Sequence, residues 1–493
     1  MIELSEKEYK RMSFIGRKII FSLYFLVFAG FAFAEPSNYT YNYDFWQEQV
    51  ASPDAYRPAG YFLGSTLGVG HFRDPQGLFI RDNRVYICDT GNNRIVLIEV
   101  NDAGDHTVTR IVSSVLIDGE QSALAGPTDI FEDRDGSLYI ADNRNQRVLK
   151  LDRNWNFVYA IYKPDDESFE DNMEFLPVKL VVDFAGRIFV QATNINKGLL
   201  EFDNRGEFAG YMVANRVVIN IIDFIWKTIA TQSQREQMDL FIPTEYTNLA
   251  LDGDGFIYVT NATGETDPVR RLNAMGQDIL IRNGYEDPVG DLTFGNAGGI
   301  SGRSRLIDIV AFENDSYAAF DRTRGRIFMY DFQGNLLYAF GGVGNREGYF
   351  SLPAALDKMG NSLYALDSRT AALTRFDLTL YGQLINNALN EYKAGRYESS
   401  ADIWEEVLKM NGNYDLAYIG IGRASLRQGD YQRSMRYYKL KHHREGYGKA
   451  FQLYRKGWME ENLWRMLLIL GIAILIPLIV KKTINVVKEI KEA

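Results

Sequence analysis

The chain has 493 residues, of which 46% are hydrophobic and 24% charged, a globular composition with room for several domains. Its formal net charge of −10 argues against a nucleic acid partner, because an acidic protein is repelled by the phosphate backbone. The only cysteine, Cys88, excludes an internal disulfide, and we expect it to be a buried thiol.

An apolar run near the N-terminus has the features of an export signal. Arg17 and Lys18 precede the run, and Ala32 and Ala34 form a small-x-small cleavage pattern before Glu35. We therefore predict a signal segment over residues 1–34, with an uncleaved membrane anchor as the alternative. Met1 and Met12 are both possible starts. Export without disulfides favours a bacterial cell surface.

A phrase of short strands and tight turns returns six times over residues 56–380. Its clearest copy begins at Pro127, turns at Asp135 and Gly136, and continues through a strand ending at Asp142 to Arg147. The other copies begin at Pro75, Pro177, Tyr246, Leu306 and Pro353. A repeat of this length is typical of a β-propeller blade, and one blade cannot bury both faces alone. We predict a mainly β fold containing a six-bladed propeller.

The two ends of the repeat predict how the ring closes. Residues 61–64, before the first copy, are similar to residues 338–341, before the last copy. The last copy ends at Asp377, after its third strand. The N-terminal strand is therefore expected to complete the last blade, which removes two free sheet edges.

The phrase resembles the NHL-repeat family, most closely in its first two copies. The third copy has lost the acid, since it reads Phe189-Val190-Gln191-Ala192, and the sixth lacks the Asn-x-Arg element that precedes the third strand. The resemblance implies a six-bladed propeller, and it implies binding more often than catalysis.

Equivalent positions in five copies hold an acidic or amide residue, and propeller geometry gathers them on one face. These residues are Asp89, Asp142, Asn261, Asp321 and Asp367. Paired with nearby arginines such as Arg94 and Arg147, the aspartates would fix the loop between strands two and three. The same residues, with Arg94 and Arg147, are alternatively a binding rim. A catalytic role is the third interpretation, by similarity to lactonase-type propellers.

The step from the third to the fourth copy contains an insertion. Apolar residues at helical spacing, including Phe224, predict a helix over residues 220–237. This helix either docks a partner through Phe224 and Trp226 or covers apolar propeller surface. Residues 287–304 are a second, glycine-rich excursion that we expect to be a surface loop.

No pattern of catalytic or metal-binding residues is recognisable. The chain has four histidines, and the propeller contains only His71 and His106, too few for a zinc site on its axis. Neither a nucleophile motif nor a phosphate loop is present. We expect no metal and no cofactor, and we favour binding over enzymatic activity.

From about residue 382 the pattern changes to helices. The segments 393–397 and 427–431 match at a spacing of 34 residues, and Ser400 and Trp404 are answered by Ser434 and Tyr438. This pattern resembles the tetratricopeptide family. The resemblance implies a helical module over residues 382–458 that binds peptide segments or proteins. A rigid stalk is the alternative.

A second apolar segment, residues 463–481, predicts a transmembrane helix, with a buried helix as the alternative. Fifteen residues from Met466 to Val480 carry no charge, and lysines follow at positions 481, 482, 488 and 491. The positive-inside rule places the tail, residues 482–493, in the cytoplasm and the body outside.

These elements predict a membrane-tethered extracellular binding or scaffold protein within a membrane transport or envelope complex. A protein partner is expected, with glycan as the main small-ligand option. The alternative is an extracellular hydrolase or lyase of the lactonase or amidating-lyase kind.

Overall fold

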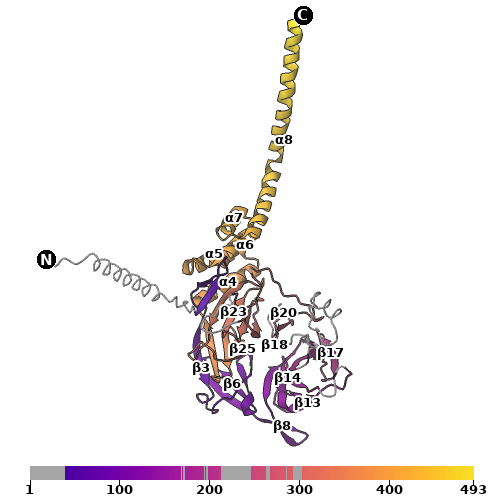
Figure 1. Cartoon of the computed structure of the whole chain (residues 1–493), viewed down its shortest axis with the longest axis vertical. Coiled ribbons are helices and arrows are strands. Elements are labelled where there is room, and N and C mark those ends of the chain that lie inside the picture. Colours follow the sequence, from indigo (N-terminus) through magenta and orange to yellow (C-terminus); the bar gives the residue numbers. More distant parts are fainter. Residues whose placement is uncertain are drawn as a thin grey trace, which may run out of the picture.

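The computed structural model describes residues 39–492 except 168, 170–172, 194, 196–197, 213–245, 262–266, 285 and 293–301. Within these residues the chain forms a six-bladed β-propeller followed by a helical region that ends in one long helix (Figure 1). The predicted fold class is confirmed. The signal segment and the insertion helix with Phe224 and Trp226 lie outside the described residues.

Blades one to three are antiparallel sheets in which each strand pairs with the next along the chain. Their strands are β4 (Gly77–Arg81), β5 (Arg84–Asp89), β6 (Arg94–Val100) and β7 (His106–Val112); β10 (Pro127–Glu132), β11 (Leu138–Asp142), β12 (Arg147–Leu151) and β13 (Phe157–Ile161); and β14 (Leu176–Val182), β15 (Ile188–Thr193), β16 (Leu199–Phe202) and β17 (Phe208–Met212). A hairpin of β8 (Ser114–Ile117) and β9 (Glu120–Ala123) links the first two blades.

Blade four has three strands in the described part of the chain, and blades five and six have four propeller strands each. These strands are β18 (Tyr246–Leu251), β19 (Ile257–Asn261) and β20 (Val269–Leu272); β21 (Leu306–Ala311), β22 (Tyr317–Asp321), β23 (Arg326–Tyr330) and β24 (Leu336–Gly341); and β25 (Pro353–Met359), β26 (Ser362–Asp367), β27 (Ala372–Leu378) and β3 (Tyr56–Leu63).

The N-terminal strand closes the ring. Strand β3 pairs antiparallel with β27, with Tyr56 opposite Leu378 and Leu63 opposite Ala372. The predicted closure is therefore confirmed. Two further strands, β1 (Thr40–Tyr43) and β2 (Gln49–Ala51), extend blade five beyond β24, a pairing that the repeat did not indicate.

The recurring acidic-glycine turn has a local cause. In blade two the Gly136 amide donates to the Asp133 carbonyl oxygen at 3.0 Å, and Gly136 has a φ of 88°, which glycine adopts without steric cost. The strand that follows, β11, is buried along its whole length. Apolar strands between tight turns thus stack into a ring with both faces of each sheet covered.

Five helices follow the propeller in the described residues. They are α4 (Leu380–Lys393), α5 (Tyr397–Met410), α6 (Asp415–Gln428), α7 (Tyr431–Leu440) and α8 (Arg444–Glu492). The 34-residue spacing of the sequence returns in their contacts. The Ser400 hydroxyl donates to the Ala388 carbonyl at 2.8 Å, and the Ser434 hydroxyl donates to the Gly422 carbonyl at 2.7 Å. Equivalent serines thus join α4 to α5 and α6 to α7.

Helices α4 to α6 share a hydrophobic core with the propeller. One cluster contains Phe320 and Leu337 of blade five together with Tyr381, Trp404 and Tyr414 of the helices. The Tyr414 hydroxyl also donates to the Leu337 carbonyl at 2.8 Å. The helical region therefore packs directly on the propeller.

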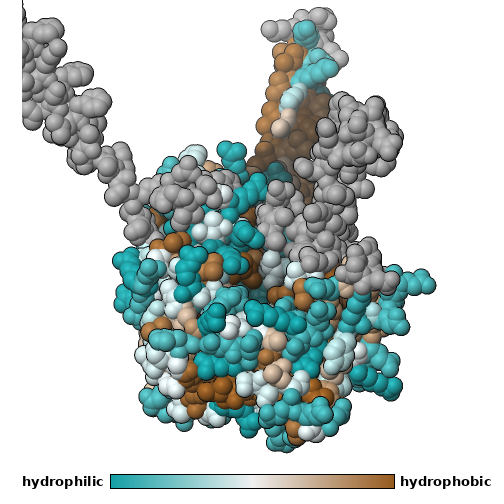
Figure 2. Space-filling model, turned by 60° about the horizontal axis from the view of Figure 1, so that its bottom comes forward, coloured by the Kyte–Doolittle hydropathy of each residue, from teal (hydrophilic) through white to brown (hydrophobic). Residues whose placement is uncertain are grey.

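Helix α8 is, among the described residues, the one helix long and apolar enough to cross a membrane by length and composition. It projects away from the body, and its surface is largely apolar where that of the propeller is mixed (Figures 1 and 2). Leu467 and Ile469, for example, are 59% and 65% exposed. An extended helix that exposes so much apolar surface is suited to a lipid surrounding.

Candidate functional site

The aspartates predicted at equivalent blade positions end the second strand of their blades. Asp89 accepts hydrogen bonds from Arg94 Nε and from the Arg73 backbone amide, both at 2.7 Å. Asp142 makes the same kinds of contact, at 2.8 Å to Arg147 Nε and 2.7 Å to a loop amide. Both aspartates are fully buried. Each one ties the loop entering its blade to the turn between strands two and three.

Asp321 and Asp367 fix their loops through backbone amides, at 2.7 Å from the Arg305 nitrogen and 2.8 Å from the Leu352 nitrogen. The Asn261 side chain donates to a carbonyl of its own loop at 3.0 Å. All of these contacts agree with the loop-fixing interpretation. The binding rim formed by these residues stays a prediction.

A second set of side chains lies near the propeller axis, one per blade, at the third position of the repeated phrase. In chain order this axial set is Gly77, Asp129, Lys179, Asn248, Asp308 and Ala355. Blade one has glycine because a Cβ at Gly77 would lie 2.4 Å from the Thr128 carbonyl oxygen. The four polar members line a cavity of about 340 Å³, which we call the axial cavity.

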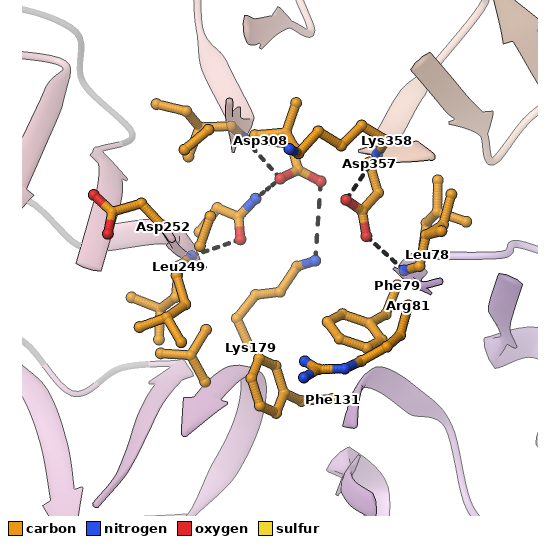
Figure 3. Close-up of a pocket in the computed structure, with 18 of the residues that line it drawn as sticks. Leu78, Phe79, Arg81, Phe131, Lys179, Leu249, Asp252, Asp308, Asp357 and Lys358 are labelled. Atoms are coloured by element: carbon orange, nitrogen blue, oxygen red, sulfur yellow. Dashed lines mark hydrogen bonds and ion pairs between the residues drawn. The ribbon is translucent and has the colours of Figure 1, made fainter. Parts of the chain in front are cut away.

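Lys179 connects the two acids of the axial set, and Figure 3 shows its ammonium directed at Asp308. Its Nζ lies 3.3 Å from Asp129 Oδ1 and 4.0 Å from Asp308 Oδ2. The Asn248 amide donates to Asp308. Backbone amides also donate to both acids: the Leu180 amide to Asp129 Oδ2 at 3.0 Å, and the Leu356 amide at 2.8 Å to Asp308 Oδ2, the oxygen that Lys179 approaches. One cation is thus shared by two carboxyl groups.

Burial sets the protonation of this network. It raises the pKa of Asp129, with Lys179 opposing the shift, and it raises the pKa of Asp308 to about 6. Burial alone would lower the pKa of Lys179, but attraction to Asp129 and Asp308 outweighs it, and the pKa is raised. The ammonium therefore stays charged at neutral pH, while the acids are less acidic than in water.

Asp357 lines the same cavity, two residues after the axial position of blade six. Its carboxylate accepts from the backbone amides of Ile80 at 2.6 Å and Lys358 at 2.7 Å (Figure 3). Among the described residues no cation lies within ion-pair distance of it. Burial raises the pKa of Asp357 to about 7, with nearby Asp308 raising it further and Lys358 opposing.

The axial cavity borders an open cleft beside α4. Phe312, Glu313 and Lys358 line both the cavity and this cleft, whose volume is about 900 Å³. Four side-chain amides of α4 also line the cleft: Gln383, Asn386, Asn387 and Asn390. Asn386 Oδ1 is buried there and has no hydrogen-bond partner in the described part of the chain. The cleft lies at the opposite end of the inner strands from Asp89 and Asp142, because those residues lie where the inner strands begin.

Sequence reasoning singled out the loop-fixing aspartates and missed the axial residues. A signal was present, since Asp129, Lys179 and Asp308 occupy one repeat position in strands that are otherwise apolar. Repetition marks structural residues, whereas a ligand site on the axis needs a different residue from each blade. Within the described ranges, no group of three or more His, Cys, Asp or Glu is placed to hold a metal ion.

No protein-family model matches the chain, and none of the curated proteins matches it. Similar solved structures are propellers of low identity. A virginiamycin B lyase from Staphylococcus aureus has 12% identity and a TM-score of 0.40 over 66% of this chain and 100% of that chain.

Two other similar structures have comparable scores. The extracellular domain assigned to a hybrid two-component system (BT4673) of B. thetaiotaomicron has 12% identity and a TM-score of 0.36 over 67% of this chain and 40% of that chain. The structure of U3-55K has 10% identity and a TM-score of 0.38 over 66% of this chain and 85% of that chain. At these scores the similarities carry no argument for function, and the six blades are established by the strand pairing itself.

Proposed function

We propose that the chain is a membrane-tethered binding protein that recognises a segment of a partner protein in the cleft between the propeller and α4. The observation that carries this proposal is the cleft itself, which is walled by propeller loops on one side and by side-chain amides of α4 on the other. The shared core holds the two walls in place.

The lining of the cleft suits an extended polypeptide. Each Asn or Gln side chain offers both a donor and an acceptor, the same pair that every peptide unit offers. Asn387 and Asn390 lie on one face of α4, because residues three apart are neighbours on a helix surface. Asn386 and Gln383 line the same cleft. The 34-residue repeat of contacts in α4 to α7 also supports a tetratricopeptide-like, peptide-binding module.

The proposed topology follows from the two ends of the chain. Lysines at 481, 482, 488 and 491 follow the apolar part of α8, which favours a cytoplasmic tail. The export signal predicted over residues 1–34 favours an exterior propeller. Protease added to intact spheroplasts should digest the propeller and leave a fragment from about residue 460 onward. A propeller that survives until lysis would show the opposite orientation.

Recognition is tested with the full-length chain in membranes. We expect Asn387→Ala/Asn390→Ala to lose most of the partner protein that crosslinks to and co-purifies with the wild type. Both residues are exposed, so the fold is retained. The matched control is Gln121→Ala/Asn154→Ala, which removes two exposed amides elsewhere on the propeller. If the cleft variant still captured the partner protein as the wild type does, the proposal would be contradicted. If the variant instead lost binding of a purified glycan and kept its protein partners, the cleft would be a glycan site and not a peptide site.

The second candidate is an extracellular hydrolase or lyase, favoured by Asp357. A carboxyl group whose pKa is about 7 in a cavity is suited to general acid–base catalysis. Screening lactones and glycans as substrates would test this candidate, since turnover should be lost in Asp357→Asn. Turnover that persists in this variant would remove Asp357 from any mechanism.

A further inference from the structure

The inner wall of the axial cavity carries more acid than base. Of the cations that line the cavity, Lys179 alone lies within ion-pair distance of Asp129 and Asp308, and in the described residues none lies within that distance of Asp357. Asp357 is held by two backbone amides and has no cation beside it in the described structure. Backbone amides stabilise a carboxylate but carry no net charge, so the charge of Asp357 remains uncompensated in a poorly solvated place.

The other charged groups near Asp357 are engaged elsewhere. Lys358 directs its ammonium to the Phe312 ring, 5.0 Å from the ring centroid, and its pKa is lowered by burial. Arg81, on the neighbouring inner strand β4, donates to the Glu132 carbonyl at 3.2 Å. Asp308, on β21, is itself acidic, so it repels the negative charge of Asp357 and raises the pKa of Asp357.

Aromatic walls complete the cavity. The rings of Phe79 and Phe131 lie 5.0 Å apart at 47°, and both line the cavity that Asp357 enters (Figure 3). Aromatic faces attract cations and pack against methylene groups. The cavity already accommodates one primary ammonium, that of Lys179, and about 340 Å³ is within the size range of small-molecule sites.

We propose that the axial cavity binds a primary ammonium group on an aliphatic arm, with Asp357 as its counter-ion and the rings of Phe79 and Phe131 along the arm. This inference rests on the proposed function and extends it. The ammonium is that of a lysine side chain in the polypeptide segment that lies in the adjoining cleft. The two sites share Phe312, Glu313 and Lys358, so one ligand can occupy both.

A single lysine analogue tests the cavity without the partner. The probe is Nα-acetyl-lysine methylamide, compared with Nα-acetyl-norleucine methylamide, which has an arm of similar length without the ammonium. Calorimetric titration uses the full-length protein in detergent at pH 8. We expect the lysine probe to bind wild type at least roughly tenfold more tightly than the norleucine probe, because a desolvated charge pair is worth more than about 1.4 kcal/mol.

Substitution at Asp357 should remove this preference. Asp357→Asn keeps the shape of the side chain and removes its charge, so the two probes should bind equally. The matched control, Asp118→Asn, neutralises an exposed aspartate on the β8–β9 turn and should leave the preference intact. Equal binding of the two probes to wild type, or an undiminished preference in Asp357→Asn, would overturn the inference.

A pH titration of wild type gives an independent readout if Asp357→Asn does not fold. Binding of the lysine probe should weaken from pH 8 to pH 5.5 as Asp357 takes up a proton, and pH-independent binding would overturn the inference. Capture of the partner by the α4 amides is measured separately. Loss of capture in Asn387→Ala/Asn390→Ala without any lysine preference would leave the proposed function standing and reject only the cavity ligand.

Discussion

Two aspartates in the same ring of blades, the fully buried Asp142 and the half-buried Asp357, have opposite surroundings. Asp142, at the end of β11, has an arginine at 2.8 Å as well as a backbone amide and the Asn145 side chain as donors. Asp357, in the axial cavity, has backbone donors only, and its pKa is raised to about 7. The first carboxylate has a matched cation, and the second has none.

This difference separates structural from functional use of one residue type. A buried ion pair with complete hydrogen bonds is fixed by its own partners and stabilises only what it connects. A buried acid without a cation costs stability, and that cost is recovered when a cationic ligand binds. A cationic ligand therefore gains more binding free energy by pairing with Asp357 than by approaching one of the repeated aspartates.

Removing the cation of a matched pair should have the largest effect. Arg147→Met leaves Asp142 charged, buried and unpaired, which we expect to lower the free energy of unfolding by about 3–5 kcal/mol. Chemical denaturation of the purified protein measures the loss. Arg144→Met, an exposed arginine of the same blade, is the control. A loss below about 1 kcal/mol would show that the pair is solvated like a surface ion pair.

Removing the shared cation of the axial cavity should cost less, and the cost should depend on pH. Lys179→Met leaves Asp129 and Asp308 without a cation, but both acids can take up a proton because burial already raises their pKa values. We expect a loss of about 2–3 kcal/mol at pH 8 that shrinks at pH 5.5. Lys449→Met, an exposed lysine on α8, is the control. An equal loss at both pH values would contradict this electrostatic account.

The unpaired acid should make stability fall with rising pH. The pKa of Asp357 in the folded protein, about 7, lies above its ordinary value of 3.8. The folded state therefore holds a proton that the unfolded chain releases, and stability decreases between about pH 4 and pH 7. Asp357→Asn should flatten this dependence by about 1–3 kcal/mol. The measurement is the melting temperature of wild type and variant from pH 4.5 to 8. If the two plots of melting temperature against pH were parallel, the pH dependence of stability would arise from other groups.

Removing a hydrogen bond between uncharged groups should have the smallest effect on stability. Tyr414→Phe removes the buried hydrogen bond from the N-cap residue of α6 to the Leu337 carbonyl, and we expect the free energy of unfolding to fall by about 1 kcal/mol. Tyr162→Phe removes an exposed hydroxyl and serves as the control. If Tyr414→Phe instead released the helices from the propeller, limited proteolysis between residues 378 and 397 would become faster while the propeller stayed intact.

The sequence alone determined the ring and its closure. Short apolar strands with glycine turns, such as the turn at Gly136, can bury both faces only by stacking, and the strand missing after Asp377 had one candidate near residue 61. It also determined the long apolar helix, because an uncharged run such as 466–480 is a local property. Strands β1 and β2 were not predicted, because they pair at the outer edge of blade five and their sequence does not belong to the repeated phrase.

Only the tertiary structure decided where the blades bring different residues together. Asp129, Lys179, Asp308 and Asp357 are far apart in sequence, and each is unremarkable within its own strand. Their proximity arises because the inner strands converge on one axis, and their altered pKa values arise because that axis is poorly solvated. The cleft beside α4 likewise depends on how the helices pack against blade five, which is a property of two surfaces and not of either segment.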